Sequence, residues 1–143
     1  MPYPEQLCAP MRKELTSVGF TELMTAGDVD AHIPSATGTT LLVVNSVCGC
    51  AAGAARPGVK LALMANDAKP DHLVTVFAGQ EAEATAQARK YLAPYPPSSP
   101  AMALFKDGKL VHMLERHNIE GHSAEMIAEN LVAAFDEFCA VKA

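Results

Sequence analysis

The sequence predicts an α/β fold in which a central mixed sheet is flanked by helices, and three observations lead there. Apolar, β-branched runs of strand length alternate with helix-like segments, as is typical of parallel strands joined by right-handed crossovers. The turn signal Lys106-Asp107-Gly108-Lys109 joins the last two strands as a hairpin and so adds antiparallel strands. Finally, Cys48 and Cys50 directly follow one of the apolar runs.

Length and composition fit a single domain spanning residues 1–143. The chain has 143 residues, and half of them are hydrophobic, which is enough to build a core. The net charge of -5 gives no indication of a nucleic-acid partner. No stretch approaches the length of a membrane span, and no charged segment precedes a long apolar run at the start. We therefore expect a cytoplasmic protein without a membrane partner.

The first helix is expected over residues 4–18. Its apolar positions recur at helical spacings of four, four and three residues: Leu7, Met11, Leu15 and Val18. A short strand over 20–23 follows. Either Thr25 or Asp28 is placed to cap a short second helix, which Pro34 stops.

Residues 39–46 predict a strand that is buried on both faces, because the run is almost continuously apolar and β-branched. Small residues after Cys50 predict a helix that extends to about Asn66. Since proline disrupts the interior of a helix, we expect a kink or break at Arg56-Pro57.

The second half of the chain continues the alternation. We expect strands over 71–78, 101–105 and 110–114, and helices over 80–93 and 123–139. Prolines indicate a loop over 95–100, and polar residues indicate another over 115–122. Ser123 is placed to cap the last helix. The inner face of that helix is expected to carry Met126, Ile127, Asn130, Leu131, Ala134, Phe135 and Phe138.

The cysteine pair lies where a strand ends and a helix begins. A helix N-terminus offers unsatisfied N–H groups and the positive end of the helix dipole, and both lower the pKa of a cysteine there. Cys48, nearer the strand, is the candidate attacking thiol, and Cys50 the candidate resolving thiol. Gly49 permits the tight backbone that brings the two sulfurs together. A disulfide with one intervening residue is expected to be strained and easily reduced.

Two other interpretations of the cysteines remain open. They can be small core residues of a structural protein, or they can grip a metal or a cluster in a binding module. Metal sites usually need four ligands, and Cys8 and Cys139 stand alone near the two ends, so we expect no metal. In a reducing compartment a close pair is more often catalytic than structural. A thioredoxin-like fold places such a pair after a central strand.

Five segments carry a resemblance to a known family: 10–15 (PMRKEL), 43–53 (VVNSVCGCAAG), 75–80 (TVFAGQ), 97–100 (PSSP) and 116–122 (RHNIEGH). Together they resemble the bacilliredoxins, small cytosolic thioredoxin-fold proteins of bacteria with a C-G-C motif. The resemblance covers nearly the whole chain and implies a thioredoxin-like fold with an extra N-terminal helix. Cys8 lies outside the family pattern.

The resemblance also implies an activity. Bacilliredoxins reduce mixed disulfides between protein cysteines and the small thiol bacillithiol. Cys48 matches the attacking cysteine of the family and Cys50 the resolving cysteine. The expected partners are thus modified client proteins, with a low-molecular-weight thiol as co-substrate and no metal or organic cofactor. Because members are also described as disulfide isomerases, a general isomerase or reductase remains an alternative.

Further residues are candidates for supporting the site. By resemblance to thioredoxin folds, the Ser99-Pro100 bond is expected to be cis, to face the cysteines and to offer its backbone to an extended substrate. Arg116 and His117 follow the last strand and are expected at the same end of the sheet as Cys48. A cation there would lower the pKa of the thiol or hold an anionic small thiol, although a solvated loop is the alternative.

Overall fold

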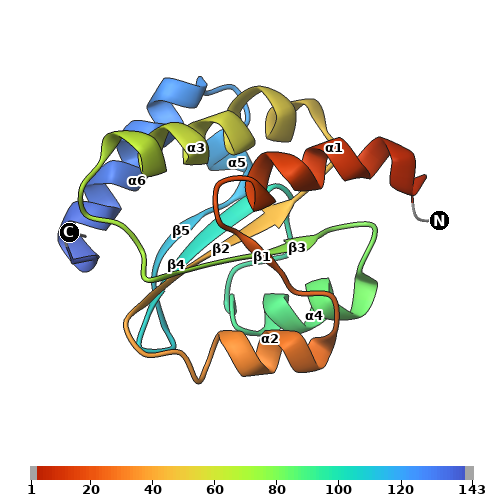
Figure 1. Ribbon diagram of the computed structural model, residues 1–143, viewed down its shortest axis with the longest axis horizontal. Coiled ribbons are helices and arrows are strands. Elements are labelled where there is room, and N and C mark those ends of the chain that lie inside the picture. The colour runs from red at the N-terminus through yellow and green to blue at the C-terminus, as the bar shows by residue number, and fades with distance from the viewer. Residues whose placement is uncertain (1–2, 141–143) are drawn as a thin grey trace.

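The computed structural model describes residues 3–140, and its frame is a five-stranded sheet in the order β1-β3-β2-β4-β5 (Figure 1). The strands are β1 (Thr21–Glu22), β2 (Thr39–Asn45), β3 (His72–Phe77), β4 (Ala101–Lys106) and β5 (Lys109–Leu114). β1 and β2 pair parallel to β3, whereas β4 is antiparallel to β2 and β5 is antiparallel to β4. The expected mixed sheet is confirmed. Because β5 therefore runs in the direction of β2, their carboxyl ends lie at the same edge.

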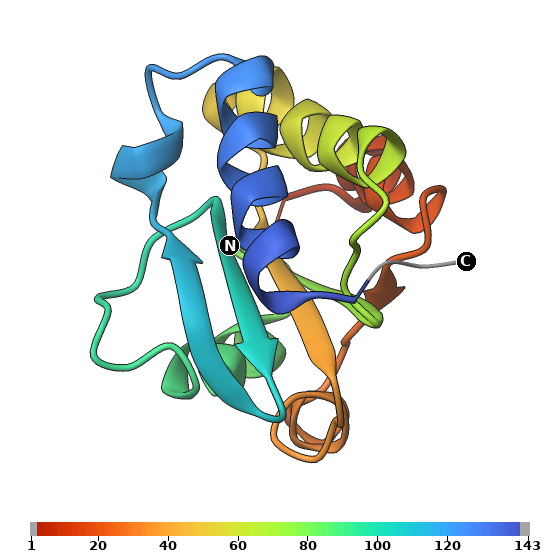
Figure 2. The same cartoon turned by 90° about the vertical axis from the view of Figure 1, so that its left-hand side faces the viewer.

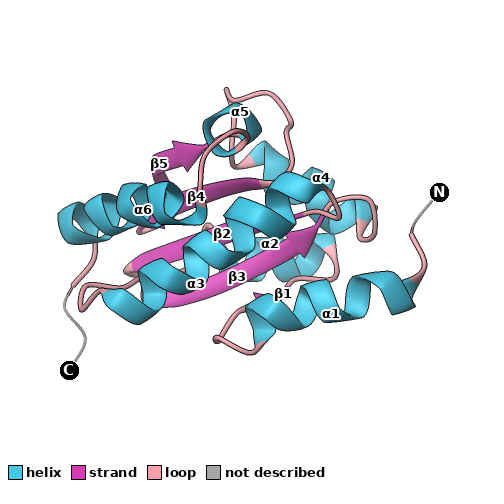
Figure 3. Cartoon of the chain, turned by 90° about the horizontal axis from the view of Figure 1, so that it is seen from above, coloured by secondary structure: helices cyan, strands magenta, loops and turns pink. Residues whose placement is uncertain are grey.

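Helices cover both faces of this sheet. They are α1 (Glu5–Thr16), α2 (Ala26–His32), η1 (Ala51–Ala55), α3 (Arg56–Ala65), α4 (Ala82–Lys90), α5 (Arg116–Ile119) and α6 (Ala124–Phe138). α1, α3 and α6 lie on one face, and α2 and α4 lie on the other (Figures 1 and 3). No helix within residues 3–140 is both long enough and apolar enough to cross a membrane.

The central strand β2 divides the core into two layers. All of its residues are buried, as the apolar run predicts. Because side chains alternate along a strand, Leu41 and Val43 pack under α3 and α6, and Leu42 and Val44 pack against the layer of α2 and α4. Figure 2 shows α6 lying beside α3 above the sheet. This packing fixes the end of β2, from which the cysteine loop departs.

Several local expectations are confirmed by the caps and turns. Thr25 caps α2 in a capping box with Asp28, so the two candidate caps act together. Ser123 caps α6 by accepting a hydrogen bond of 3.2 Å from the N–H of Met126. In the β4–β5 hairpin, Asp107 and Gly108 both have positive φ, as the tight turn requires.

The polar segment 115–122 is not simply a loop, because it contains α5. Oδ1 of Asn118 accepts a hydrogen bond of 2.9 Å from the N–H of Glu115, and the N–H of Asn118 donates to the carbonyl oxygen of Glu115, which starts a helical turn. The expected irregularity at Arg56-Pro57 takes the form of a π-helical turn, η1, that passes into α3. Pro57 lacks the N–H that a regular helix needs at this point.

The apolar faces of the first and last helices were predicted only in part. In α1, Cys8 is fully buried, whereas Leu7 is 47% exposed. In α6, Met126 is 51% exposed, and Asn130 lies outside the core, where its Oδ1 is 2.7 Å from Nε2 of His112. Each helix contacts the rest of the protein along a narrower stripe than its apolar residues occupy, so residues at the margin of the stripe face solvent.

Candidate active site

The loop after β2 holds Cys48 and Cys50 against each other at the start of η1. The backbone N–H groups of Ala51 and Ala52 donate to the carbonyl oxygen of Cys48, which opens the helical turn. The N–H of Cys48 donates a hydrogen bond of 3.1 Å to Oγ of Ser46. The two Sγ atoms lie 2.6 Å apart and share a hydrogen bond between free thiols. The strand-to-helix position predicted for the pair is therefore observed.

The two thiols differ in acidity rather than in burial, since both side chains are half-buried. Burial alone would raise the pKa of Cys48, but hydrogen bonds from the Cys50 thiol, the Ala51 N–H and the Ser46 hydroxyl outweigh it and lower that pKa. Burial and the adjoining Cys48 raise the pKa of Cys50. Burial therefore does not distinguish the attacking thiol from the resolving thiol.

Gly49 is not forced on the loop by the geometry of the free thiols. Its φ lies outside the left-handed region, and a Cβ placed on it would meet no atom within 4 Å other than those of its chain neighbours. The position is exposed to solvent. The role predicted for Gly49 in bringing the two sulfurs together therefore stays a prediction.

A buried arginine fixes the loop from below, and sequence reasoning missed its role. Arg56 is 1% exposed, and its Nη1 donates hydrogen bonds of 3.0 Å to Oδ1 of Asn45 and 2.7 Å to the carbonyl oxygen of Ser46. Its Nε forms an ion pair of 3.0 Å with Glu14 of α1. Oδ1 of Asn45 also accepts a hydrogen bond of 2.9 Å from the Ser46 N–H, so the Asn45 side chain holds the backbone of the loop. The only sequence signal was a lone charge among small helical residues.

A cleft of about 340 Å³ opens beside Cys48. Its lining comes from six segments of the chain: Tyr3, Ser46, Val47, Cys48, Ala78, Gly79, Arg89, Ser99 and Arg116. The expected cis bond between Ser99 and Pro100 is present, and Ser99 faces the cleft with Cys48. Nη1 of Arg116 donates a hydrogen bond of 3.3 Å to the carbonyl oxygen of Ser99. Arg116 is therefore at the cysteine end of the sheet, as predicted.

His117 does not join Arg116 at the cleft. Its side chain is 73% exposed and lies 3.7 Å from a carboxylate oxygen of Glu115, an ion pair that exists only when His117 is protonated. Consecutive residues of a helical turn point about 100° apart, so the turn that directs Arg116 to the cleft directs His117 elsewhere. The expectation that His117 supports the site therefore gains nothing from its position.

Arg89 is a second site residue that sequence reasoning missed. It comes from α4, which lies on the opposite face of the sheet from α3 (Figure 1). Its side chain lines the cleft together with Cys48. Its Nε is buried without a hydrogen-bond partner, and burial lowers the pKa of its guanidinium. In sequence it is one more charge on an alanine-rich helix, which usually means a solvated residue.

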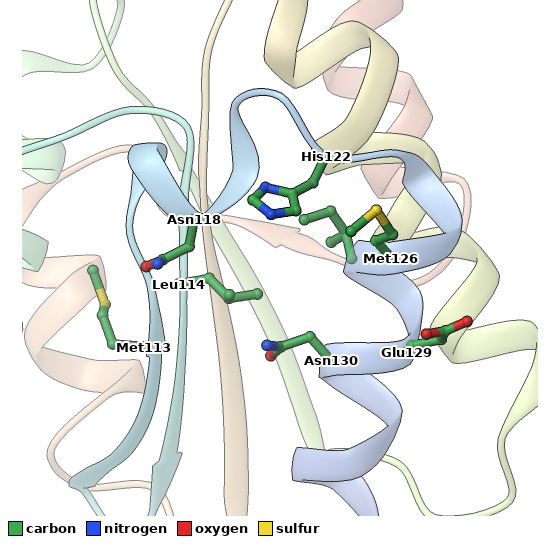
Figure 4. A pocket seen from close by; sticks show the side chains of 8 residues that line it. Met113, Leu114, Asn118, His122, Met126, Glu129 and Asn130 are labelled. Atoms are coloured by element: carbon green, nitrogen blue, oxygen red, sulfur yellow. The ribbon is translucent and has the colours of Figure 1, made fainter.

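A larger hollow of about 540 Å³ lies between β5, α5 and α6 and contains none of the cysteines (Figure 4). His122 and Met126 line it together with Asn118 and Asn130.

Within residues 3–140 there is no cluster of three or more His, Cys, Asp or Glu side chains that could hold a metal ion.

Several known proteins are similar to this chain over nearly its whole length. The model of a family described as disulphide isomerase matches residues 3–139. A bacilliredoxin of Halalkalibacterium halodurans is 58% identical over 137 residues, covering 96% of this chain and 94% of the relative. A bacilliredoxin of Cytophaga hutchinsonii is 58% identical over 135 residues, covering 94% and 98% respectively.

Solved structures establish the fold. A mutant thioredoxin from Halobacterium salinarum matches with a TM-score of 0.58 at 16% identity, over 88% of this chain and 96% of that chain. A thioredoxin from Fasciola hepatica matches with a TM-score of 0.54 at 20% identity, over 81% and 99%. The predicted thioredoxin-like fold with an additional N-terminal helix, α1, is confirmed.

Proposed function

We propose a specific reaction from the premise that this chain belongs to the disulphide isomerase family, whose members include the bacilliredoxins. The chain is a thiol-disulfide oxidoreductase. In our proposal it removes bacillithiol, or a similar small thiol, from mixed disulfides on client proteins. Cys48 attacks, Cys50 resolves, and no metal or organic cofactor takes part.

One observation carries this proposal: the two thiols share a hydrogen bond, and their pKa values shift in opposite directions. The pKa of Cys48 falls, and that of Cys50 rises. Because the thiolate is the nucleophilic form, the lowered pKa favours Cys48 as the attacking group. The higher pKa keeps Cys50 protonated, so that it donates its hydrogen bond to the Cys48 thiolate until it is needed.

The reaction proceeds in two exchanges. The Cys48 thiolate attacks the small-thiol sulfur of the client's mixed disulfide, forms a new S–S bond and releases the client as a thiolate, which takes a proton from solvent. Cys50 then loses its proton and attacks Cys48 Sγ, which releases the small thiol in reduced form and leaves a Cys48–Cys50 disulfide. A reducing thiol outside the protein returns the pair to the dithiol.

Intact-mass measurement of two serine variants tests these roles. Each variant is mixed with a client that carries a single small-thiol adduct. Cys50→Ser should take the adduct onto Cys48, because the first exchange needs only one thiolate. It should then stall unless an outside thiol clears the adduct. Cys48→Ser should leave the client modified. If Cys48→Ser takes the adduct onto Cys50 as fast as Cys50→Ser takes it onto Cys48, the two roles are reversed. If neither variant nor the wild-type protein removes the adduct from the client, the proposed activity is wrong.

The family description favours disulfide isomerisation as a second candidate. An isomerase would use the same attack by Cys48 on a disulfide between two client cysteines, and it would not need Cys50. The rate at which mispaired client disulfides rearrange separates the two functions. An isomerase should keep that rate in Cys50→Ser, whereas repeated removal of a small thiol should stop in the same variant when no outside thiol is present to clear the adduct on Cys48.

The proposed partners are clients with mixed disulfides and a low-molecular-weight thiol, and the proposed compartment is the cytoplasm. A dithiol that works as a reductant needs surroundings that keep it reduced, which favours a reducing compartment. Trapping with Cys50→Ser tests the choice of partner. Clients modified with bacillithiol should lose their small-thiol adduct to Cys48 faster than the same clients modified with glutathione.

A further inference from the structure

Arg89 lacks a counter-charge where it lies beside the nucleophile. Among residues 3–140 it makes no ion pair, and its buried Nε has no hydrogen-bond partner. A partly buried cation without a partner is costly, because desolvation is not compensated by pairing. Such a group points to a ligand that supplies the missing negative charge.

The cleft around Arg89 has a charge pattern that suits an anion. Its lining includes two cations, Arg89 and Arg116, and no aspartate or glutamate, although the whole chain has a net charge of -5. Arg116 already forms an ion pair of 3.1 Å with Glu120, so Arg89 is the cation left uncompensated. The two arginines approach from different elements, α4 and α5, and Cys48 lies in the same lining.

The dimensions fit a small molecule better than a folded surface. A cleft of about 340 Å³ is at the lower end of the range for small-molecule sites. A guanidinium binds a carboxylate through paired, directional hydrogen bonds. A low-molecular-weight thiol with a carboxylate could therefore place its sulfur at Cys48 while its acidic group occupies the cleft.

We propose that Arg89, with Arg116 beside it, forms an anion subsite that holds the carboxylate of a low-molecular-weight thiol during exchange at Cys48. This inference rests on the proposed function of Cys48 as the attacking thiol. The subsite orients the small-thiol half of the mixed disulfide, so that its sulfur, rather than the client sulfur, meets the Cys48 thiolate. The S–S bond between client and small thiol breaks, the bond between Cys48 and the small thiol forms, and the client leaves as a thiolate.

A competition at Cys48 tests the subsite without any client. The Cys50→Ser protein is equilibrated with equal amounts of glutathione disulfide, which carries carboxylates, and 2-hydroxyethyl disulfide, which carries no charge. Intact mass gives the ratio of the two adducts on Cys48. We expect the glutathione adduct to be favoured, and Arg89→Gln to lower the ratio about tenfold, as for the loss of one charge-assisted hydrogen bond.

Lys90→Gln is the matched control, because it removes the same charge from the neighbouring exposed position of α4 and should leave the ratio unchanged. Arg89→Lys should keep part of the preference. Cystamine, a disulfide whose two halves each carry an ammonium group, should form less adduct than 2-hydroxyethyl disulfide, and Arg89→Gln should raise its share. In the Cys50→Ser protein itself, raising the salt concentration should lower the ratio of the glutathione adduct to the uncharged adduct. This tests the subsite without any change at Arg89.

The outcomes separate the two proposals. If neither disulfide forms an adduct on Cys48, the proposed function is wrong. If the two adducts form equally in the Cys50→Ser protein, or if adding Arg89→Gln leaves their ratio unchanged, the exchange activity stands and the anion subsite is wrong. If Arg89→Gln and Lys90→Gln lower the adduct ratio equally, the preference comes from the net charge of the protein, and the subsite is wrong.

Discussion

Nη1 of Arg56 donates a hydrogen bond of 2.7 Å to the carbonyl oxygen of Ser46, so a buried cation holds the backbone two residues before Cys48. The same Nη1 atom bonds Oδ1 of Asn45 at the end of β2. The active-site loop is thereby tied to the first residue of α3 as well as to the strand from which it departs. Its geometry is set before any partner arrives.

Replacing Arg56 should destabilise the protein. Arg56→Met keeps the bulk but leaves the buried Ser46 carbonyl without this donor and Asn45 with one donor fewer, so we expect a loss of about 2–3 kcal/mol in the free energy of unfolding. Urea denaturation measures it. Glu14→Gln is the control: its side chain is 37% exposed and can still accept from Arg56, so its cost should stay below about 1 kcal/mol. Equal costs would contradict the anchoring role.

The pKa of Cys48 should depend on the hydrogen bond from residue 50. Because the Cys50 thiol is the largest of the influences that lower this pKa, Cys50→Ala should raise it, whereas Cys50→Ser keeps a donor and should raise it less. The rate of Cys48 alkylation by iodoacetamide, followed against pH, reports the thiolate. Its midpoint should lie below the free-cysteine value of about 8.5 in Cys50→Ser. Identical midpoints in the two variants would show that the thiol pair does not set the acidity.

The Cys48–Cys50 disulfide should be more oxidising than that of thioredoxin, which lies at about -270 mV. Interactions that lower the pKa of Cys48 stabilise the reduced, thiolate form, and a more stable reduced form means a higher potential. Equilibration with a glutathione redox buffer gives the value. A potential more negative than that of thioredoxin would mean that the fold stabilises the disulfide form more than it stabilises the reduced, thiolate form.

Gly58 should resist substitution because α3 and α6 cross closely there. A Cβ at this position would lie 2.7 Å from Cβ and 2.8 Å from Cγ2 of Ile127. Gly58→Ala should therefore cost about 1–3 kcal/mol through overpacking, as measured by thermal or urea unfolding. Gly53→Ala is the matched control, since nothing lies within 4 Å of its Cβ, and it should be neutral or mildly stabilising. Similar losses at both glycines would place the effect in the helix backbone rather than in the helix contact.

The sequence by itself determined the features that depend on neighbouring residues. The apolar run of β2, the turn at Asp107 and Gly108, and the place of Cys48 between a strand and a helix are all local patterns. Local propensity and periodicity act within a few residues, and the fold follows from them through short crossovers.

Only the tertiary structure decided which side chains surround the sulfurs. Arg56 meets Glu14 across 42 residues of sequence, and Arg89 reaches the cleft from a helix on the other face of the sheet. The acidity of Cys48 and Cys50 likewise depends on burial and on the hydrogen bonds each thiol receives. Desolvation and charge pairing sum over everything within a few ångströms of a group, whatever its distance along the chain, and a linear pattern does not contain that sum.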